Sequence, residues 1–307
     1  MSQPIKGLVA APFTLMHADG SVNLDGIGPH AEMLAANGVV GAFVCGSTGE
    51  WPSLTVPERL QIAERWVTDS PDDLRIIVHV GHLCLDDCKT LAAHAQKIGA
   101  CAIGTVAPCY FKPATLDDLI DFCAATAAAA PDLPFYYYHI PVLTGVRFPM
   151  SDLLETGAER IPTLAGLKFT DENLMEYRKC LVAQGGRFNV MFGRDEILLT
   201  SLALGGEAAV GSTYCYMAPI YQRVISAFES GDMESARAAQ SCAIEAIELL
   251  GKYSGGGAGK AIMKITGLDC GPVRLPLRNL TDEQEAGLRA DLERIGFFDY
   301  CSKVPQD

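Results

Sequence analysis

Short apolar runs alternate with longer amphipathic stretches along most of the chain. Each run has the length of a β-strand, and its nearly continuous hydrophobic content is typical of strands buried on both faces of a parallel sheet. The eight predicted strands are Gly7–Pro12, Val39–Cys45, Arg75–Val80, Ala102–Ala107, Pro134–His139, Thr163–Phe169, Phe188–Phe192 and Ala208–Ser212.

The stretches between these runs have the periodicity of helices. Leu60, Ala63 and Val67 recur at helical spacing, and Pro57 occupies the first turn of the same stretch. Thr115 is followed by two early aspartates, which is the pattern of a capped helix N-terminus. Strands and helices therefore alternate regularly, as they do in α/β proteins.

Eight strand–helix units are typical of an eightfold β/α (TIM) barrel, which commonly takes about 250 residues. An open, doubly wound sheet stays the alternative, because alternation alone does not show that the sheet closes. After the eighth unit only helical patterns follow, separated by loops at Gly255–Gly257 and Gly271–Pro276. We predict a barrel carrying the active site over residues 1–230 and a C-terminal three-helix extension over residues 231–307. The three predicted helices are Asp232–Gly251, Ala258–Gly267 and Thr281–Ile295.

Composition and charge narrow the class of partner. Of 307 residues, 49% are hydrophobic, which is enough to fill a full core, and the formal net charge of −13 disfavours nucleic acid and anionic membranes. The eleven cysteines are scattered, mostly in apolar runs, and none forms a Cys-x-x-Cys motif, which favours reduced thiols. The N-terminal residues lack the pattern of a signal peptide, and no apolar stretch has the length of a membrane span. We expect a cytoplasmic protein.

Three motifs resemble known sites but fail on inspection. Gly26–Ala31 matches a loose dinucleotide fingerprint, yet it lies well after the first strand rather than in its turn. Gly255–Lys260 resembles a phosphate loop, but Ala261 stands where a Ser or Thr would hold magnesium. His79 and His82 have no acidic or cysteine partner at metal-site spacing. We therefore expect neither nucleotide nor metal.

A lone lysine in the sixth predicted strand is the strongest candidate for chemistry. Lys168 lies between Leu167 and Phe169, where burying a charged amine is costly, so a neutral and nucleophilic amine is favoured. Tyr138 stands near the end of the fifth strand, and its phenol can pass protons. The pair indicates imine chemistry on a carbonyl substrate. The alternative is a lysine that extends from a strand end to solvent.

The loop after the second strand indicates an anion site. Ser47 and Thr48 stand between two glycines before a predicted helix, and such a loop presents free amides and hydroxyls that suit a carboxylate. The alternative is an ordinary Ser/Thr helix cap.

Further polar residues follow the later strands, at the carboxyl ends where barrel enzymes carry their active sites. Thr170 follows the sixth strand, Gly193, Asp195 and Glu196 follow the seventh, and Ser212 ends the eighth. An acidic pair beside a glycine can bind sugar hydroxyls, although a charged helix N-terminus has the same pattern. Taken together, these residues describe a pocket with a carboxylate clamp, an imine lysine, a phenol and a polyol site.

Two of these motifs carry a specific resemblance. With Gly46-Ser47-Thr48-Gly49-Glu50 and Gly166-Leu167-Lys168, the chain resembles the pyruvate-dependent class I aldolase family of N-acetylneuraminate lyase and dihydrodipicolinate synthase. The resemblance extends from Gly7 to about Phe297. Within the family, Tyr136–Val146 and Gly211–Tyr214 resemble the sialic acid lyase branch closely.

The resemblance implies a role for each matching position. Lys168 would form a Schiff base with the keto carbon, Tyr138 would relay the proton during carbon–carbon cleavage, and Ser47 and Thr48 would hold the carboxylate. Tyr110 is a further candidate proton relay, near a tyrosine that some members contribute across a subunit interface. No metal or organic cofactor is required, and the family implies a homotetramer. The residues that would line the sugar-chain pocket are Thr170, Gly193, Asp195, Glu196 and Ser212.

One departure from the family separates its branches. Dihydrodipicolinate synthases typically carry an arginine after the catalytic tyrosine to hold a second carboxylate, whereas Leu143 and Thr144 stand in that loop here and neither makes a charge-assisted pair. The resemblance therefore favours a neutral polyol partner and implies cleavage of sialic acid to N-acetylmannosamine and pyruvate. The alternatives are a keto-deoxy sugar acid aldolase, a dihydrodipicolinate synthase-like enzyme, and a non-catalytic pyruvate-binding sensor.

Overall fold

The computed structural model describes residues 4–253 and 255–305, and its centre is a closed barrel of eight parallel strands. Neighbours in sequence are neighbours in the sheet, and β8 pairs with β1, for example Gly7 beside Ala208. The predicted TIM barrel is confirmed, and the open-sheet alternative is wrong. The strands are β1 (Gly7–Ala10), β2 (Gly41–Val44), β3 (Arg75–His79), β4 (Ala102–Val106), β5 (Phe135–His139), β6 (Leu164–Phe169), β7 (Asn189–Phe192) and β8 (Ala208–Gly211).

Both faces of the barrel strands are buried, which is why each strand reads as an apolar run. Alternate residues, such as Val9, Phe43 and Met191, pack together in one cluster, while Leu8 and Val44 belong to the larger core. This alternation follows from the two-residue period of a strand. The predicted runs therefore match the strands to within about two residues at either end, the usual uncertainty of element ends.

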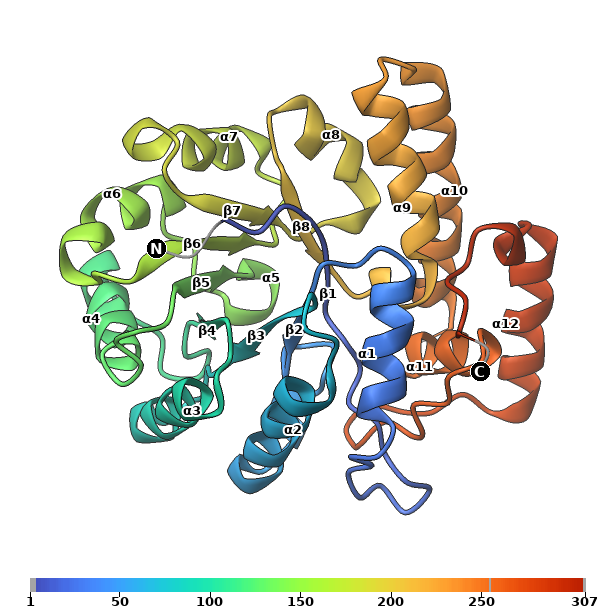
Figure 1. The fold of residues 1–307 in the computed structure, drawn as a ribbon, viewed down its shortest axis with the longest axis horizontal. Coiled ribbons are helices and arrows are strands. Elements are labelled where there is room, and N and C mark those ends of the chain that lie inside the picture. Colours follow the sequence, from blue (N-terminus) through green and yellow to red (C-terminus); the bar gives the residue numbers. More distant parts are fainter. Residues whose placement is uncertain (1–3, 254, 306–307) are drawn as a thin grey trace.

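A ring of helices surrounds the barrel (Figure 1). The predicted start of α4 is confirmed, since Thr115 accepts a hydrogen bond from the Asp118 amide in a capping box. The helix with Pro57 in its first turn begins the same way, because Thr55 and Glu58 cap one another's amides. The helices are α1 (Ile27–Ala36), α2 (Val56–Asp69), α3 (Leu85–Ile98), α4 (Leu116–Ala127), α5 (Pro141–Thr144), α6 (Met150–Arg160), α7 (Leu174–Val182), α8 (Leu198–Ala203) and α9 (Tyr214–Glu229), with 3-10 turns at Trp51–Ser53 (η1), Ala183–Gly185 (η2) and Asp195–Ile197 (η3).

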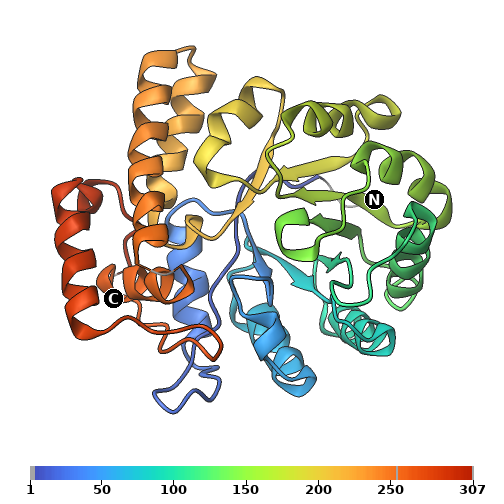
Figure 2. The same cartoon turned by 180° about the vertical axis from the view of Figure 1, so that it is seen from behind.

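The chain ends in helices α10 (Met233–Lys252), α11 (Gly256–Ile265) and α12 (Asp282–Arg294), followed by the 3-10 turn η4 (Phe297–Asp299). They gather on one side of the barrel, with α10 alongside α9 in both views (Figures 1 and 2). The assignment of Gly255–Gly257 to a loop is wrong in part, because Gly256 and Gly257 belong to α11. A Cβ on Gly257 would lie 2.3 Å from the Arg278 carbonyl oxygen, so close packing explains this glycine. The division into units at residue 230 stays a prediction.

A buried ion pair joins α11 to the loop after β2. Lys260 Nζ lies 2.9 Å from a carboxylate oxygen of Glu50, and both side chains are almost fully buried. Lys260 also donates to the Pro272 carbonyl, and the Arg274 amide donates to Glu50. The lysine that resembled part of a phosphate loop therefore anchors the helical extension to the barrel mouth.

Disulfide bonds, membrane-spanning helices and metal sites were also considered among the described residues. Among the residues described, every cysteine is unpaired, and most are buried. Within the same residues no helix is both long and apolar enough to cross a membrane, and no group of three His, Cys, Asp or Glu side chains could hold a metal ion.

Candidate active site

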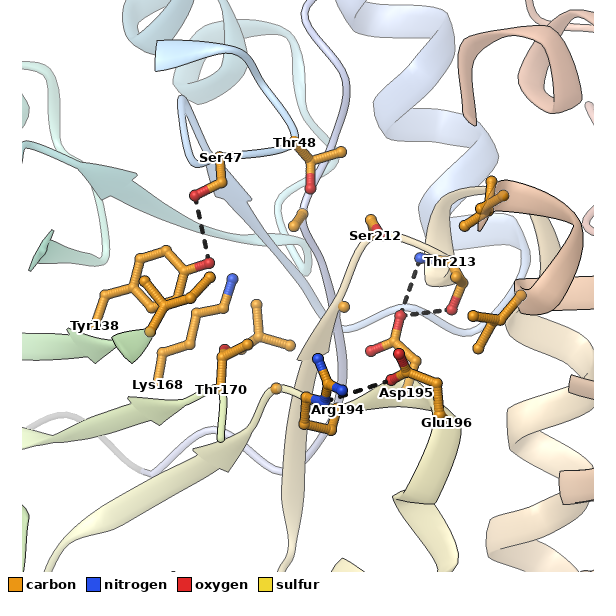
Figure 3. A pocket seen from close by; sticks show the side chains of 17 residues that line it. Ser47, Thr48, Tyr138, Lys168, Thr170, Arg194, Asp195, Glu196, Ser212 and Thr213 are labelled. Atoms are coloured by element: carbon orange, nitrogen blue, oxygen red, sulfur yellow. Dashed lines mark hydrogen bonds and ion pairs between the residues drawn. The ribbon is translucent and has the colours of Figure 1, made fainter. Parts of the chain in front are cut away.

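A cavity of about 220 Å³ opens at the carboxyl ends of the strands (Figure 3). It is the place where barrel enzymes carry their chemistry. The structure brings the predicted site residues together around it, with the exception of Tyr110. The predicted residues on its wall are Ser47, Thr48, Tyr138, Lys168, Thr170, Gly193, Asp195, Glu196 and Ser212.

Lys168 points into this cavity and is 4% exposed, so the alternative of a lysine that extends to solvent is wrong. Its neighbour across the β5–β6 pairing is Tyr138, whose ring centroid lies 4.1 Å from Lys168 Nζ. The ring of Phe43 lies 4.7 Å from the same atom. Among the described residues no carboxylate forms an ion pair with Lys168, so its amine stays available to a ligand.

Tyr138 lies between Lys168 and the loop after β2. Its hydroxyl is 3.5 Å from Ser47 Oγ, the outer limit of a hydrogen bond, and the Tyr138 side chain is buried. Phe43 and His79 pack edge-on against its ring. The aromatic packing fixes the phenol beside the lysine, and Ser47 offers the next position for a proton.

Ser47 and Thr48 stand across the cavity from Lys168 (Figure 3). The helix-cap alternative is wrong for them, because η1 has no side-chain cap and α2 is capped by Thr55. Thr14 Oγ1 donates to the Gly49 carbonyl at 2.6 Å, and this hydrogen bond holds the loop after β2 in place. Both residues line the cavity, and the Ser47 hydroxyl also lies beside that of Tyr138.

The acidic pair divides into two different groups. Asp195 is 6% exposed, and its Oδ2 accepts hydrogen bonds from the Thr213 amide (3.2 Å) and Thr213 Oγ1 (2.6 Å). Burial raises the pKa of Asp195 to about 6, and the neighbouring Glu196 charge acts in the same direction. Glu196 is more exposed and lies 3.9 Å from Arg194 Nε. Sequence reasoning treated Asp195 and Glu196 alike, whereas the Asp195 side chain is buried and the Glu196 side chain is partly exposed.

Some lining residues were missed by sequence reasoning. Arg194 lines the cavity and pairs with Glu172, although its only signal was a place between two candidate residues. Ile247 and Leu250 of α10 also line it, so the helical extension supplies part of a wall that was assigned to residues 1–230 alone. An apolar face of a helix carries no mark of such a role.

Two histidines that resembled a metal pair have separate surroundings. His79 is fully buried, and its Nδ1 lies 2.9 Å from the Cys45 carbonyl oxygen, so that nitrogen carries the proton. Burial lowers the pKa of His79 well below its ordinary value, and the ring is neutral. His82 instead lies 3.2 Å from Asp87 near the surface.

Tyr110 does not reach this cavity. Its side chain is 77% exposed and stacks edge-on with Phe111, on the loop that follows β4. Leu143 is also exposed, and Thr144 is buried with its hydroxyl on the Ile140 carbonyl. Both residues belong to α5, and neither brings a positive charge to the site.

The chain is similar to known proteins in both sequence and fold. The profile of the Dihydrodipicolinate synthetase family matches residues 4–295. N-acetylneuraminate lyases from Pongo abelii and Homo sapiens are each 43% identical over 304 residues, which cover 96% of this chain and 95% of the relative. The solved structure of Proteus mirabilis N-acetylneuraminate lyase superposes with a TM-score of 0.94 at 41% identity, covering 96% of this chain and 100% of that one. The lyase from Aliivibrio salmonicida gives the same TM-score and identity, covering 96% and 98%. The chain therefore belongs to the dihydrodipicolinate synthetase family.

Proposed function

We propose that the protein is a class I aldolase that reversibly cleaves N-acetylneuraminate to N-acetylmannosamine and pyruvate through a Schiff base on Lys168. The observation that carries the proposal is the placement of one unpaired, buried lysine beside a buried phenol, in a cavity with hydroxyls on one wall and carboxylates on the other. The 43% identity to lyases of that name supports the choice of substrate.

The first step uses Lys168 as the nucleophile. Its amine attacks the C2 carbonyl of the open-chain sugar acid after losing its proton, and loss of water gives an iminium whose nitrogen accepts electrons. Ser47 and Thr48 bind the adjacent carboxylate through their hydroxyls. The rings of Tyr138 and Phe43, 4.1 Å and 4.7 Å from Nζ, position the Lys168 side chain for this attack.

The second step breaks the C3–C4 bond. The proton of the C4 hydroxyl passes to the Tyr138 oxygen while the Tyr138 proton passes through Ser47 Oγ to the bound carboxylate, the C4 oxygen becomes the aldehyde of N-acetylmannosamine, and the bonding electrons enter the iminium to give an enamine. Protonation of C3 and hydrolysis of the imine release pyruvate and restore the amine. Ser47 Oγ, 3.5 Å from the Tyr138 hydroxyl, is the next proton carrier.

The far end of the cavity suits a neutral chain of hydroxyl groups. Thr170, Ser212 and the backbone at Gly193 offer neutral partners, and Asp195 and Glu196 accept hydrogen bonds. A dihydrodipicolinate synthase-like reaction instead needs a cation for a second carboxylate. Among the residues described on the wall, the guanidinium of Arg194 is engaged by Glu172.

An assembly of several copies, a homotetramer in the family, is part of the proposal. Tyr110 and Phe111 on the loop after β4, together with Val142 and Leu143 of α5, are 62–86% exposed. Large apolar side chains exposed in this way indicate a contact with another protein chain. A cytoplasmic location fits the unpaired cysteines. Light scattering on the purified protein measures the assembly directly.

Borohydride trapping tests the chemistry. Reduction in the presence of pyruvate is expected to add a pyruvyl mass to the peptide that contains Lys168, and Lys168→Arg removes both trapping and turnover because a guanidinium stays protonated. Label on Lys260, the other buried lysine, would overturn the assignment.

A second assay decides the partner. The enzyme is incubated with pyruvate and either N-acetylmannosamine or aspartate semialdehyde. Condensation with the amino sugar is expected, whereas condensation with the semialdehyde alone would replace the lyase by a synthase.

A further inference from the structure

Asp195 is held by a chain of hydrogen bonds that begins at Thr213, on the cavity wall, and continues to Tyr221 of α9. Thr213 Oγ1 is 2.6 Å from Asp195 Oδ2 and 2.8 Å from the Tyr221 hydroxyl. A carboxylate only accepts, so the single proton of Thr213 Oγ1 goes to Asp195, and Tyr221 donates its own proton to Thr213. The three groups form a directed chain, Tyr221 to Thr213 to Asp195, and all three are buried.

A second anchor comes from the helical extension. Gln240 of α10 donates from Nε2 to the main-chain oxygen of Asp195 at 3.1 Å. Its Oε1 accepts from the Leu199 amide at 3.0 Å, so both ends of the amide are used. Helix α10 therefore fixes the backbone that carries Asp195, while α9 fixes its side chain.

The two oxygens of the Asp195 carboxylate therefore differ. Oδ2 accepts two hydrogen bonds from Thr213, whereas Oδ1 accepts none within the described part of the chain. Asp195 Oδ1 is buried and has no hydrogen-bond partner among the described residues. Asp195 Oδ1 lies against β8, and a Cβ on Gly211 would be 1.9 Å from it. Figure 3 shows it as the carboxylate oxygen on the side away from Thr213. A buried acceptor without a donor is costly unless a ligand supplies one.

We propose that Thr213, supported by Tyr221 and Gln240, is a positioning residue for sugar recognition: it orients the Asp195 carboxylate so that Oδ1 receives a hydroxyl of the neutral sugar chain. This inference rests on the proposed function. It adds Thr213 as a residue that supports sugar binding without touching the reacting atoms. It also makes the helical extension a determinant of substrate choice.

The proton on Asp195 gives a readout that a merely structural role would not change. Burial and Glu196 raise the pKa of Asp195 to about 6, whereas the Thr213 hydrogen bonds and the Lys168 charge lower it. Burial raises the pKa values of the phenols of α9 that face it, Tyr214, Tyr216 and Tyr221, and the Asp195 charge raises them further, with the Tyr214 hydroxyl in contact with that carboxylate. Loss of the Thr213 hydroxyl therefore moves the Asp195 pKa upward.

Thr213→Val is the central variant, because it keeps the shape and removes the donor. We expect the KM for N-acetylneuraminate to rise about 10–100-fold, the range for losing a hydrogen bond to a charged group, with pyruvate trapping within about twofold of wild type. The acidic limb of kcat/KM shifts to higher pH. Thr213→Ser restores the hydroxyl and rescues both values. Thr126→Val is the matched control, since Thr126 is a buried threonine whose hydroxyl bonds only to the Phe122 carbonyl of its own helix.

Tyr221→Phe is the second variant and keeps the test decisive if Thr213→Val does not fold. It removes one neutral donor, so the KM for N-acetylneuraminate should rise by about 3–10-fold. The acidic limb of kcat/KM should again shift to higher pH. An unchanged KM and an unchanged pH profile in the folded variants would overturn the inference, as would equal losses of sugar cleavage and pyruvate trapping. Wild-type protein that traps pyruvate but does not cleave N-acetylneuraminate would instead overturn the proposed function.

Discussion

Replacing Asp195 by Asn should stabilise the protein at neutral pH while weakening its reaction. Burial raises the pKa of Asp195 to about 6 in the folded protein, against an ordinary value of 3.8. A group whose folded pKa is raised contributes stability that is present below its unfolded pKa and is lost as the pH rises through the folded value. The wild-type protein therefore carries the cost of a buried charge above about pH 6.

The size of this cost follows from the two pKa values. They differ by about two, and a difference of one corresponds to about 1.4 kcal/mol, so the ionised carboxylate costs ~3 kcal/mol of unfolding free energy at pH 8 relative to pH 4. Asn does not titrate, and its side-chain oxygen still accepts the hydrogen bonds that Thr213 donates. The stability difference between Asp195→Asn and wild type should therefore grow by roughly 3 kcal/mol between pH 4 and pH 8 in favour of the variant.

Urea unfolding of both proteins at several pH values between 4 and 8 measures this difference. Asp232→Asn is the control of opposite sign, because the hydrogen bonds from Ser235 lower the pKa of Asp232, the exposed cap of α10. The stability gained from Asp232 is present above its unfolded pKa and is lost as the pH falls through its folded value. A stability difference for Asp195→Asn that does not change with pH, or that shrinks as the pH rises, would refute the reasoning. The Asp195→Asn variant should also show a raised KM for the sugar acid, because the gain in stability comes with a loss of function.

Three further substitutions test other parts of the site. Tyr138→Phe should keep pyruvate trapping but lower kcat by about 10²–10⁴-fold, the scale of a positioned acid–base group, in an assay that measures pyruvate release. Glu196→Gln should raise the KM for N-acetylneuraminate about tenfold or more while trapping is unchanged, because a hydrogen bond to a charged group is lost. Lys260→Met leaves the Glu50 carboxylate buried without its cation and should cost about 3–5 kcal/mol in urea unfolding.

Each of these has an outcome that contradicts it. Near-normal turnover of Tyr138→Phe would transfer the proton relay to another group, with Tyr110 of a neighbouring copy as the first candidate. A Glu196→Gln enzyme with normal KM would mean that the sugar chain does not meet that carboxylate. For Lys260→Met, adding Glu50→Gln should recover most of the loss, and a double variant as unstable as the single one would show that the charge pair is not the cause.

The strands and the reactive lysine were readable from the sequence because each leaves a local mark. Strands buried on both faces need continuous apolar runs, and a lysine inside such a run has few structural uses. Closure of the barrel left no such mark, since it depends on β1 pairing with β8, whose residues Gly7 and Ala208 lie far apart in the sequence. The boundary of α11 was misplaced for a related reason, because Gly257, which favours a loop, is required inside the helix by packing against Arg278.

What the sequence by itself determined was the inventory of the site: a lysine and a phenol inside strands, and four aliphatic hydroxyls and two carboxylates after strand ends. Only the tertiary structure decided how these groups differ, since burial and hydrogen bonding are properties of neighbours rather than of residues. Asp195 and Glu196 are adjacent in the chain, yet Thr213 donates to an oxygen of Asp195 alone. Glu196 is partly exposed and lies near Arg194 instead. Gln240 reaches the same place from α10, a helix whose sequence shows only an amphipathic pattern. Contacts between residues distant in the chain carry no local periodicity, so the fold alone turns a set of polar residues into a site with one oriented, titratable carboxylate.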